Sequence, residues 1–158
     1  MAYRNGSYIA FHAGGTTNPT ASDIKYYRIL KAWHEHSKIE FSFVNSHEKA
    51  ASVRDSSKRE TLRASLRQRL NKTKNFVLIT GETTKSDTDW VPFEIEYAID
   101  TCALPIIVTY TGYESVLNPS GLSHLWPNAL AKRIKSGVAK VIHIPFKQRL
   151  IDDALGKL

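Results

Sequence analysis

One carboxylate, Glu94, falls where a predicted helix should be apolar. The segment from Trp90 to Cys102 has the spacing of an amphipathic helix, with an apolar stripe made of Val91, Ile95, Ala98, Ile99 and Cys102. On a wheel of about 100° per residue, Glu96 and Asp100 define the solvent face, whereas Glu94 falls at about 40° from Trp90, beside the stripe. A carboxylate there is costly unless it is paired, hydrogen-bonded or facing a cleft. We expect Glu94 either to face a functional crevice or to cap the helix start or form a salt bridge there.

The elements that must position Glu94 alternate between strand-like and helix-like patterns. We expect strands at 8–11, 39–44, 76–80, 105–110 and 138–145, helices near 22–33, 57–71, 90–102 and 147–158, and irregular chain with short helical pieces at 111–137. Such alternation predicts a three-layer α/β fold in one domain over residues 1–158. Its five-stranded, mainly parallel sheet would have the flavodoxin-like order 2-1-3-4-5, and ligands bind such folds beyond the carboxyl ends of strands one and three.

Composition limits the class of protein. The 158 residues, 42% hydrophobic and 23% charged, suit a single globular domain. A net charge of +7 first suggests nucleic acid or an anionic membrane, but no nucleic-acid-binding signature accompanies it, and a small anionic ligand such as a dinucleotide is an equal partner for it. The single cysteine, Cys102, excludes an internal disulfide. With no signal-peptide pattern or membrane-length apolar run, we expect a cytoplasmic protein that binds no membrane.

Three further features leave alternatives open. A basic stretch includes Arg54, Lys58, Arg59, Arg63, Arg67 and Arg69, and is either a solvated helix face or a contact for phosphate or a partner. Gly14-Gly15 matches no phosphate-binding fingerprint, so we expect a flexible loop. His143, in a predicted strand, is expected to be a core histidine with its hydrogen bonds satisfied. No motif for metal binding is present, so no metal cofactor is expected.

The segment Ser86 to Ile95, read as SDTDWVPFEI, resembles the S-x-W-V-x-x-E-I signature of TIR-like domains. Upstream, LRASLRQRL from Leu62 to Leu70 and FVLITGETT from Phe76 to Thr84 resemble the helix and the V-L-I-x-x-x-T block of the same family. Together these segments are similar to the bacterial branch exemplified by the TIR protein of the Thoeris antiphage system. The resemblance covers about residues 57–110.

The resemblance implies a flavodoxin-like fold and an enzyme that cleaves the nicotinamide–ribose bond of NAD+, its substrate, with Glu94 matching the family's catalytic glutamate. It also implies a phage-derived trigger, a cyclic or modified ADP-ribose messenger, and a separate effector protein that the messenger activates. Self-assembly into a homo-oligomer is a further expectation. We expect the nucleotide to lie against Phe11, His12 and Trp90, although these rings are equally interpretable as ordinary core. We expect its polar contacts to come from Thr80, Gly81 and Ser86.

Two other functions fit parts of the same pattern. One is a non-enzymatic TIR interaction module, in which Glu94 has only a structural role. The other is a nucleoside deoxyribosyltransferase, which has a related topology and also uses a carboxylate. Assays with NAD+ and, separately, with deoxynucleosides as the substrate distinguish the three functions. The first enzyme consumes NAD+, the second consumes deoxynucleosides, and the interaction module consumes neither.

Overall fold

The computed structural model describes residues 6–12, 29, 32, 41–42, 56–86 and 90–157. Within them the strands are β1 (Ser7–Ala10), β2 (Phe41–Ser42), β3 (Asn75–Thr80), β4 (Ile106–Tyr110) and β5 (Val141–Pro145). The α-helices are α3 (Ser56–Lys72), α4 (Trp90–Glu96), α5 (Asn128–Lys135) and α6 (Gln148–Lys157). The described residues also contain two 3-10 helices, Thr84–Ser86 and Pro119–Leu125, and a π-helical segment, Tyr97–Thr101. Gly14-Gly15, Arg54 and most of the helix expected near 22–33 lie outside the described residues.

The sheet is parallel at every pairing. β3 lies between β1 and β4, and β5 pairs with the other edge of β4. The short β2 pairs with the start of β1, which gives the sheet order β2-β1-β3-β4-β5. The predicted α/β class with a parallel sheet is confirmed. All six residues of β3 are buried, as expected of the continuous apolar run in a parallel strand covered on both faces.

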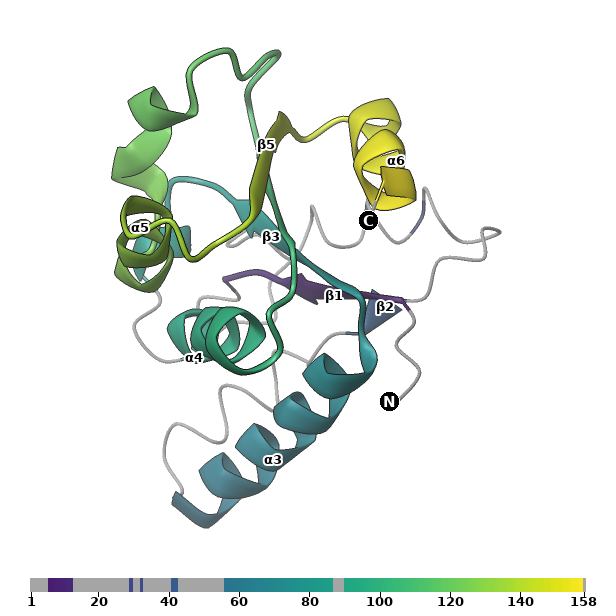
Figure 1. Cartoon of the computed structure of the whole chain (residues 1–158), viewed down its shortest axis with the longest axis vertical. Coiled ribbons are helices and arrows are strands. Elements are labelled where there is room, and N and C mark those ends of the chain that lie inside the picture. Colours follow the sequence, from purple (N-terminus) through teal and green to yellow (C-terminus); the bar gives the residue numbers. More distant parts are fainter. Residues whose placement is uncertain are drawn as a thin grey trace.

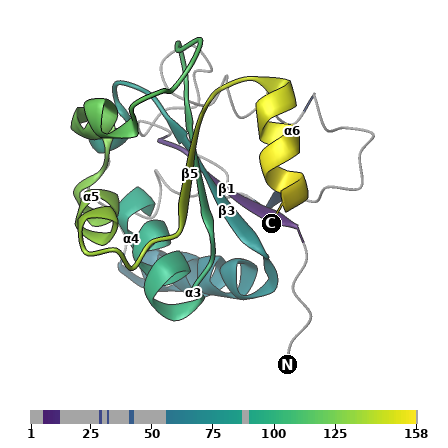
Figure 2. The same ribbon diagram turned by 45° about the horizontal axis from the view of Figure 1, so that its top comes forward.

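Successive side chains of each strand enter different cores, because they alternate between the two faces of the sheet. Tyr8, Phe76 and Val108 belong to a large cluster shared with α3, α4 and α5. Ile9, Val77 and Ile107 belong to a second cluster shared with α6. Figures 1 and 2 show these layers, with α3, α4 and α5 on one side of the sheet and α6 on the other.

The helix that carries Glu94 changes its hydrogen-bonding pattern after two turns. It begins at Trp90, with Pro92 in its first turn, where proline is tolerated. From Tyr97 it becomes π-helical, and the Cys102 amide donates to the Tyr97 carbonyl at 3.1 Å. It ends at Ala103, which has a left-handed φ of +53°. The predicted apolar stripe is buried, and Glu96 and Asp100 are exposed as expected.

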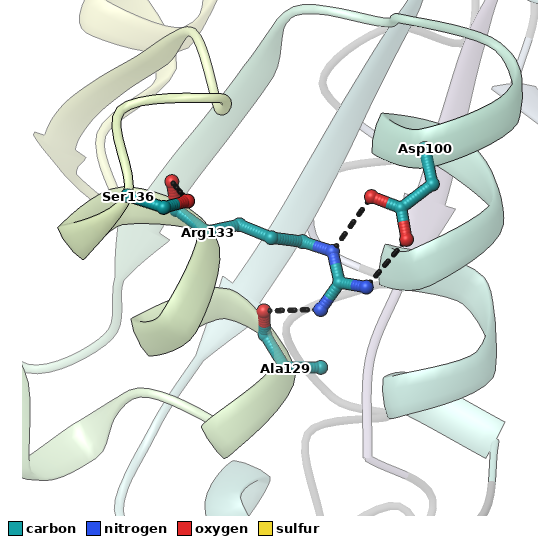
Figure 3. A network of polar contacts seen from close by, with 4 residues as sticks. All are labelled: Asp100, Ala129, Arg133 and Ser136. Atoms are coloured by element: carbon teal, nitrogen blue, oxygen red, sulfur yellow. Dashed lines mark hydrogen bonds and ion pairs between the residues drawn. The ribbon is translucent and has the colours of Figure 1, made fainter.

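An ion pair joins this helix to α5. Arg133 of α5 donates from Nε to Asp100 Oδ1 at 3.0 Å and from Nη2 to Asp100 Oδ2 at 2.5 Å. Its third nitrogen, Nη1, donates to the Ala129 carbonyl at 2.9 Å, so all three guanidinium nitrogens are engaged (Figure 3).

Among the described residues, no helix is both long enough and apolar enough to cross a bilayer.

Candidate active site

The Glu94 side chain lies in the core instead of on the surface of α4. It is 1% exposed and is the only Asp or Glu among the buried residues of the described chain. Glu94 is in the second turn of the helix, past the first turn where capping side chains act. The capping interpretation therefore does not explain its position. A buried carboxylate needs hydrogen bonds or a counter-charge to offset its lost hydration.

Tyr8 of β1 supplies one of those hydrogen bonds. Its hydroxyl donates to Glu94 Oε2 at 2.5 Å, in a buried contact between the sheet and the helix layer. The Tyr8 ring is fixed in turn, because it stacks on Phe76 of β3 with ring centroids 5.6 Å apart and planes 8° from parallel. The position of the Glu94 carboxylate is thus tied to β1 and β3, the two strands beyond whose carboxyl ends ligands bind in folds of this type.

The electrostatics keep the proton on tyrosine. Burial raises the pKa of Tyr8 well above its usual value of 10.0, and the negative charge of Glu94 and its hydrogen bond raise that pKa further. The positive charge of Arg69 acts in the opposite direction and lowers it. Tyr8 therefore remains a neutral donor to Glu94 throughout the physiological pH range.

The loop after β3 is held by its own side chains. The Gly81 amide donates to Thr84 Oγ1 at 2.8 Å, and Thr84 Oγ1 donates to the Ile79 carbonyl at 3.5 Å. The Thr80 side chain is buried and donates to the Leu78 carbonyl at 3.4 Å. In this conformation, the predicted polar contacts Thr80 and Gly81 shape the loop that leads toward α4.

The predicted aromatic walls do not all meet at Glu94. Trp90 lies one turn before Glu94 on the same helix and is buried in the cluster that also contains Tyr8. Phe11 instead belongs to the cluster on the α6 side of the sheet, so the structure does not bring it to Glu94. His12, next along the chain, is half-buried. Ser86 ends the 3-10 helix after β3, and its side chain lies outside the described residues.

Two residues of this site were not anticipated from the sequence. Tyr8 reads as an ordinary apolar strand residue, and its partner is 86 positions away. Thr84 is one of several threonines in a polar loop. The sequence does place Tyr8 in a predicted parallel strand, where its side chain would be buried. A buried tyrosine hydroxyl requires a polar partner, and this is the only signal that could have indicated its role.

A second polar cluster lies on the same face of the sheet, at β4 and β5. Trp126 Nε1 donates to the Tyr110 hydroxyl at 2.8 Å, and the same hydroxyl is 2.7 Å from His143 Nδ1. The hydroxyl oxygen accepts from Trp126, and the direction of the hydrogen bond between the hydroxyl and Nδ1 is set by the tautomer of His143. Burial lowers the pKa of His143 and raises that of Tyr110 to about 12. His143 has a hydrogen-bond partner at Nδ1 as expected, but the prediction of a core histidine is wrong, because the side chain is only half-buried.

The parallel sheet, the helices on both of its faces and the buried carboxylate after β3 define an α/β protein of flavodoxin-like type with a candidate acidic site. The family model for the TIR-like domain of Thoeris protein ThsB matches residues 8–115, which include β2, α3, β3, α4, β4 and all of β1 except Ser7. The chain belongs to this family of Thoeris TIR-like domains. It is therefore a TIR module of a defence system that has other components.

Proposed function

We propose that the protein cleaves the nicotinamide–ribose bond of NAD+ at Glu94 and makes a cyclic or otherwise modified ADP-ribose signal in antiphage defence. One observation carries the proposal: a carboxylate that is 1% exposed, bonded to Tyr8, on the helix after β3 of a TIR-like domain. Glu94 is also the residue that matches the family's catalytic glutamate. The signal would activate a separate effector protein.

The chemistry suits a carboxylate in a poorly hydrated site. Departure of neutral nicotinamide leaves positive charge on the ribose, in an oxocarbenium-like transition state. A fixed negative group stabilises that charge, and more strongly where water is excluded. Tyr8 would orient Glu94 through Oε2. The ribose then accepts either water, which gives linear ADP-ribose, or a group on the same nucleotide, which gives a cyclic product.

The burial of Glu94 bears on how activity is controlled. NAD+ reaches a carboxylate that is 1% exposed only after the groups covering it move. We therefore propose that this conformation is the resting one, and that a phage-derived trigger or self-association opens it. The purified protein alone would turn over NAD+ slowly.

The test compares Glu94→Gln with Glu96→Gln. The control residue lies on the same helix two positions away, but it is exposed. Cells that carry the wild type or either variant together with the effector are challenged with phage, and their nucleotides are measured by mass spectrometry. We expect nicotinamide release and a modified ADP-ribose in the wild type and in Glu96→Gln, and neither in Glu94→Gln.

The same experiment separates the alternatives. Undiminished nicotinamide release by a folded Glu94→Gln variant would contradict the proposal. A TIR interaction module predicts protection against phage with unchanged NAD+ in every variant. A deoxyribosyltransferase predicts base exchange when the purified protein is offered deoxynucleosides, with no consumption of NAD+.

A further inference from the structure

Two arginines of α3 lie against one aromatic ring of α4. The guanidinium carbons of Arg63 and Arg67 are 5.7 Å and 5.4 Å from the ring centroid of Phe93. They occupy successive turns of α3, whose 17 residues include six basic and one acidic residue. Attraction to the ring face restrains both side chains, so the basic stretch is not simply a solvated surface.

The ring that holds the arginines is part of the candidate active site's own helix. Phe93 immediately precedes Glu94, and it contacts the ring of Trp90 edge-to-face at 6.4 Å between centroids. On its other side it stacks with Tyr97 at 6.4 Å, and the Tyr97 hydroxyl donates to Asn71 of α3 at 3.0 Å. The arginine pair therefore contacts the residue that precedes the proposed catalytic carboxylate in the chain.

The positive charge of this pair is poorly compensated. Arg63 forms an ion pair with Glu60 at 2.7 Å, but both side chains are substantially exposed, and such pairs are weak. Nε of Arg63 is buried without a hydrogen-bond acceptor among the described residues. Within the same part of the chain, no carboxylate forms an ion pair with Arg67. Two guanidinium groups on one ring repel each other unless an anion lies between them.

A guanidinium over an aromatic face keeps its N–H donors directed away from the ring. Nη1 of Arg63 is bonded to Glu60 and its Nε is buried, so Arg63 offers Nη2 beside the guanidinium of Arg67, and the two groups can together bind a pyrophosphate with the ring as a support. We propose that Arg63 and Arg67, held on Phe93, form a subsite for the pyrophosphate of the dinucleotide whose ribose reaches Glu94. This inference rests on the proposed function, because it takes NAD+ as the substrate.

The test measures binding apart from turnover, with the full-length chain and isothermal titration calorimetry at low ionic strength. ADP-ribose is the probe, since it has the pyrophosphate but lacks the bond that would be cleaved. The variant is Arg63→Gln with Arg67→Gln. The control removes two exposed charges from α6, on the opposite face of the sheet, as Arg149→Gln with Lys157→Gln.

We expect the α3 double variant to bind ADP-ribose about tenfold to a hundredfold more weakly, from the loss of two charge-assisted contacts, and the α6 control to bind as the wild type does. Nicotinamide riboside, which has no phosphate, should bind equally to both. Arg67→Lys should weaken ADP-ribose binding less than the double variant, because it keeps the charge but loses the planar fork. In turnover assays the double variant should raise KM with little change in kcat.

The outcomes that would overturn the subsite differ from those that would overturn the reaction. The subsite proposal is contradicted if ADP-ribose binds equally to the wild type and to a folded double variant, or if it does not bind to the wild type. Neither result would contradict NAD+ turnover that depends on Glu94. ADP-ribose binding that depends on the two arginines, without NAD+ turnover in challenged cells, would contradict the proposed reaction and support the proposed subsite. Arginine-dependent binding of a short single-stranded DNA in preference to ADP-ribose would assign the arginines to nucleic acid and overturn the dinucleotide assignment.

Discussion

The hydroxyl of Tyr8 and the carboxylate of Glu94 meet at 2.5 Å, although 86 residues separate them in the chain. Tyr8 comes from the first strand of the sheet, and Glu94 comes from the helix that follows the third strand. The bond forms only after both have packed into one core. The proposed catalytic group is therefore positioned by tertiary structure, not by its own helix.

Tyr8→Phe should destabilise the protein by about 1.5–3 kcal/mol, because it keeps the ring but removes a donor from a buried charged group. Urea unfolding of the purified protein measures this loss. Tyr113→Phe is the matched control, since Tyr113 is exposed and the same atom is removed, and it should change stability by less than about 0.5 kcal/mol. Equal stability of the two variants would show that the Tyr8–Glu94 bond contributes nothing.

Stability should fall in mild acid, in part through His143. Burial lowers the pKa of His143 in the folded state below its usual value of 6.5, so the unfolded chain binds the proton more readily. The free energy of unfolding therefore decreases as the pH drops below 6.5 toward the folded-state pKa. His143→Phe should reduce this slope below pH 6.5, measured by urea unfolding at several pH values. A slope that His143→Phe does not alter would contradict the prediction.

The Arg133–Asp100 pair should contribute more than an ordinary surface ion pair. Its contact is bidentate, and the Arg133 side chain is only 17% exposed although that of Asp100 is 51% exposed. A double-mutant cycle with Arg133→Gln and Asp100→Asn should give a coupling free energy of about 0.5–1 kcal/mol, at the upper end for partly exposed pairs. The exposed pair of Lys147 and Glu114 should show no measurable coupling. Equal coupling in both cycles would show that the bidentate geometry adds nothing.

Ala103→Gly should stabilise the protein by about 0.5–1 kcal/mol. Ala103 has a φ of +53°, which is unfavourable for a residue with a Cβ atom and acceptable for glycine. The relief of backbone strain in the folded state should exceed the free-energy cost of the greater chain entropy that glycine gives the unfolded state. Ala131→Gly, within α5, is the control of opposite sign and should be destabilising, since helical φ values do not favour glycine. Thermal unfolding measures both, and a lower melting temperature for Ala103→Gly would contradict the prediction.

The sequence predicts the elements well where hydrophobic periodicity is strong. The run at 76–80 and the helix at 57–71 agree with β3 and α3 to within one residue at each end. The strand expected at 138–145 begins later, at Val141, because the exposed Val138 and Lys140 precede the pairing with β4. The segment 111–137 contains α5, whose amphipathic pattern is too short to separate from irregular chain by spacing alone.

The candidate site is less predictable because it depends on contacts between distant elements. The wheel correctly places Glu94 beside the apolar stripe, although the helix becomes π-helical after Glu96. The wheel contains no information about Tyr8, or about the side of the sheet to which Phe11 turns. The partial desolvation of Arg63 and Arg67 likewise follows from the packing of Phe93, which a list of charges along α3 does not reveal.

The π-helical segment Tyr97–Thr101 accommodates one residue more per turn than the α-helical turns before it. Glu94 lies before this segment and faces β1, whereas Asp100 lies within it and faces α5. Because the extra residue is taken up within this turn, the helix on either side of the segment keeps nearly the orientation that it would have in a regular α-helix, and both partners are met at once. Loss of one residue at this segment would restore a regular helix without turning Glu94 away from β1, so a single-residue change of length is better tolerated here than elsewhere in the helix.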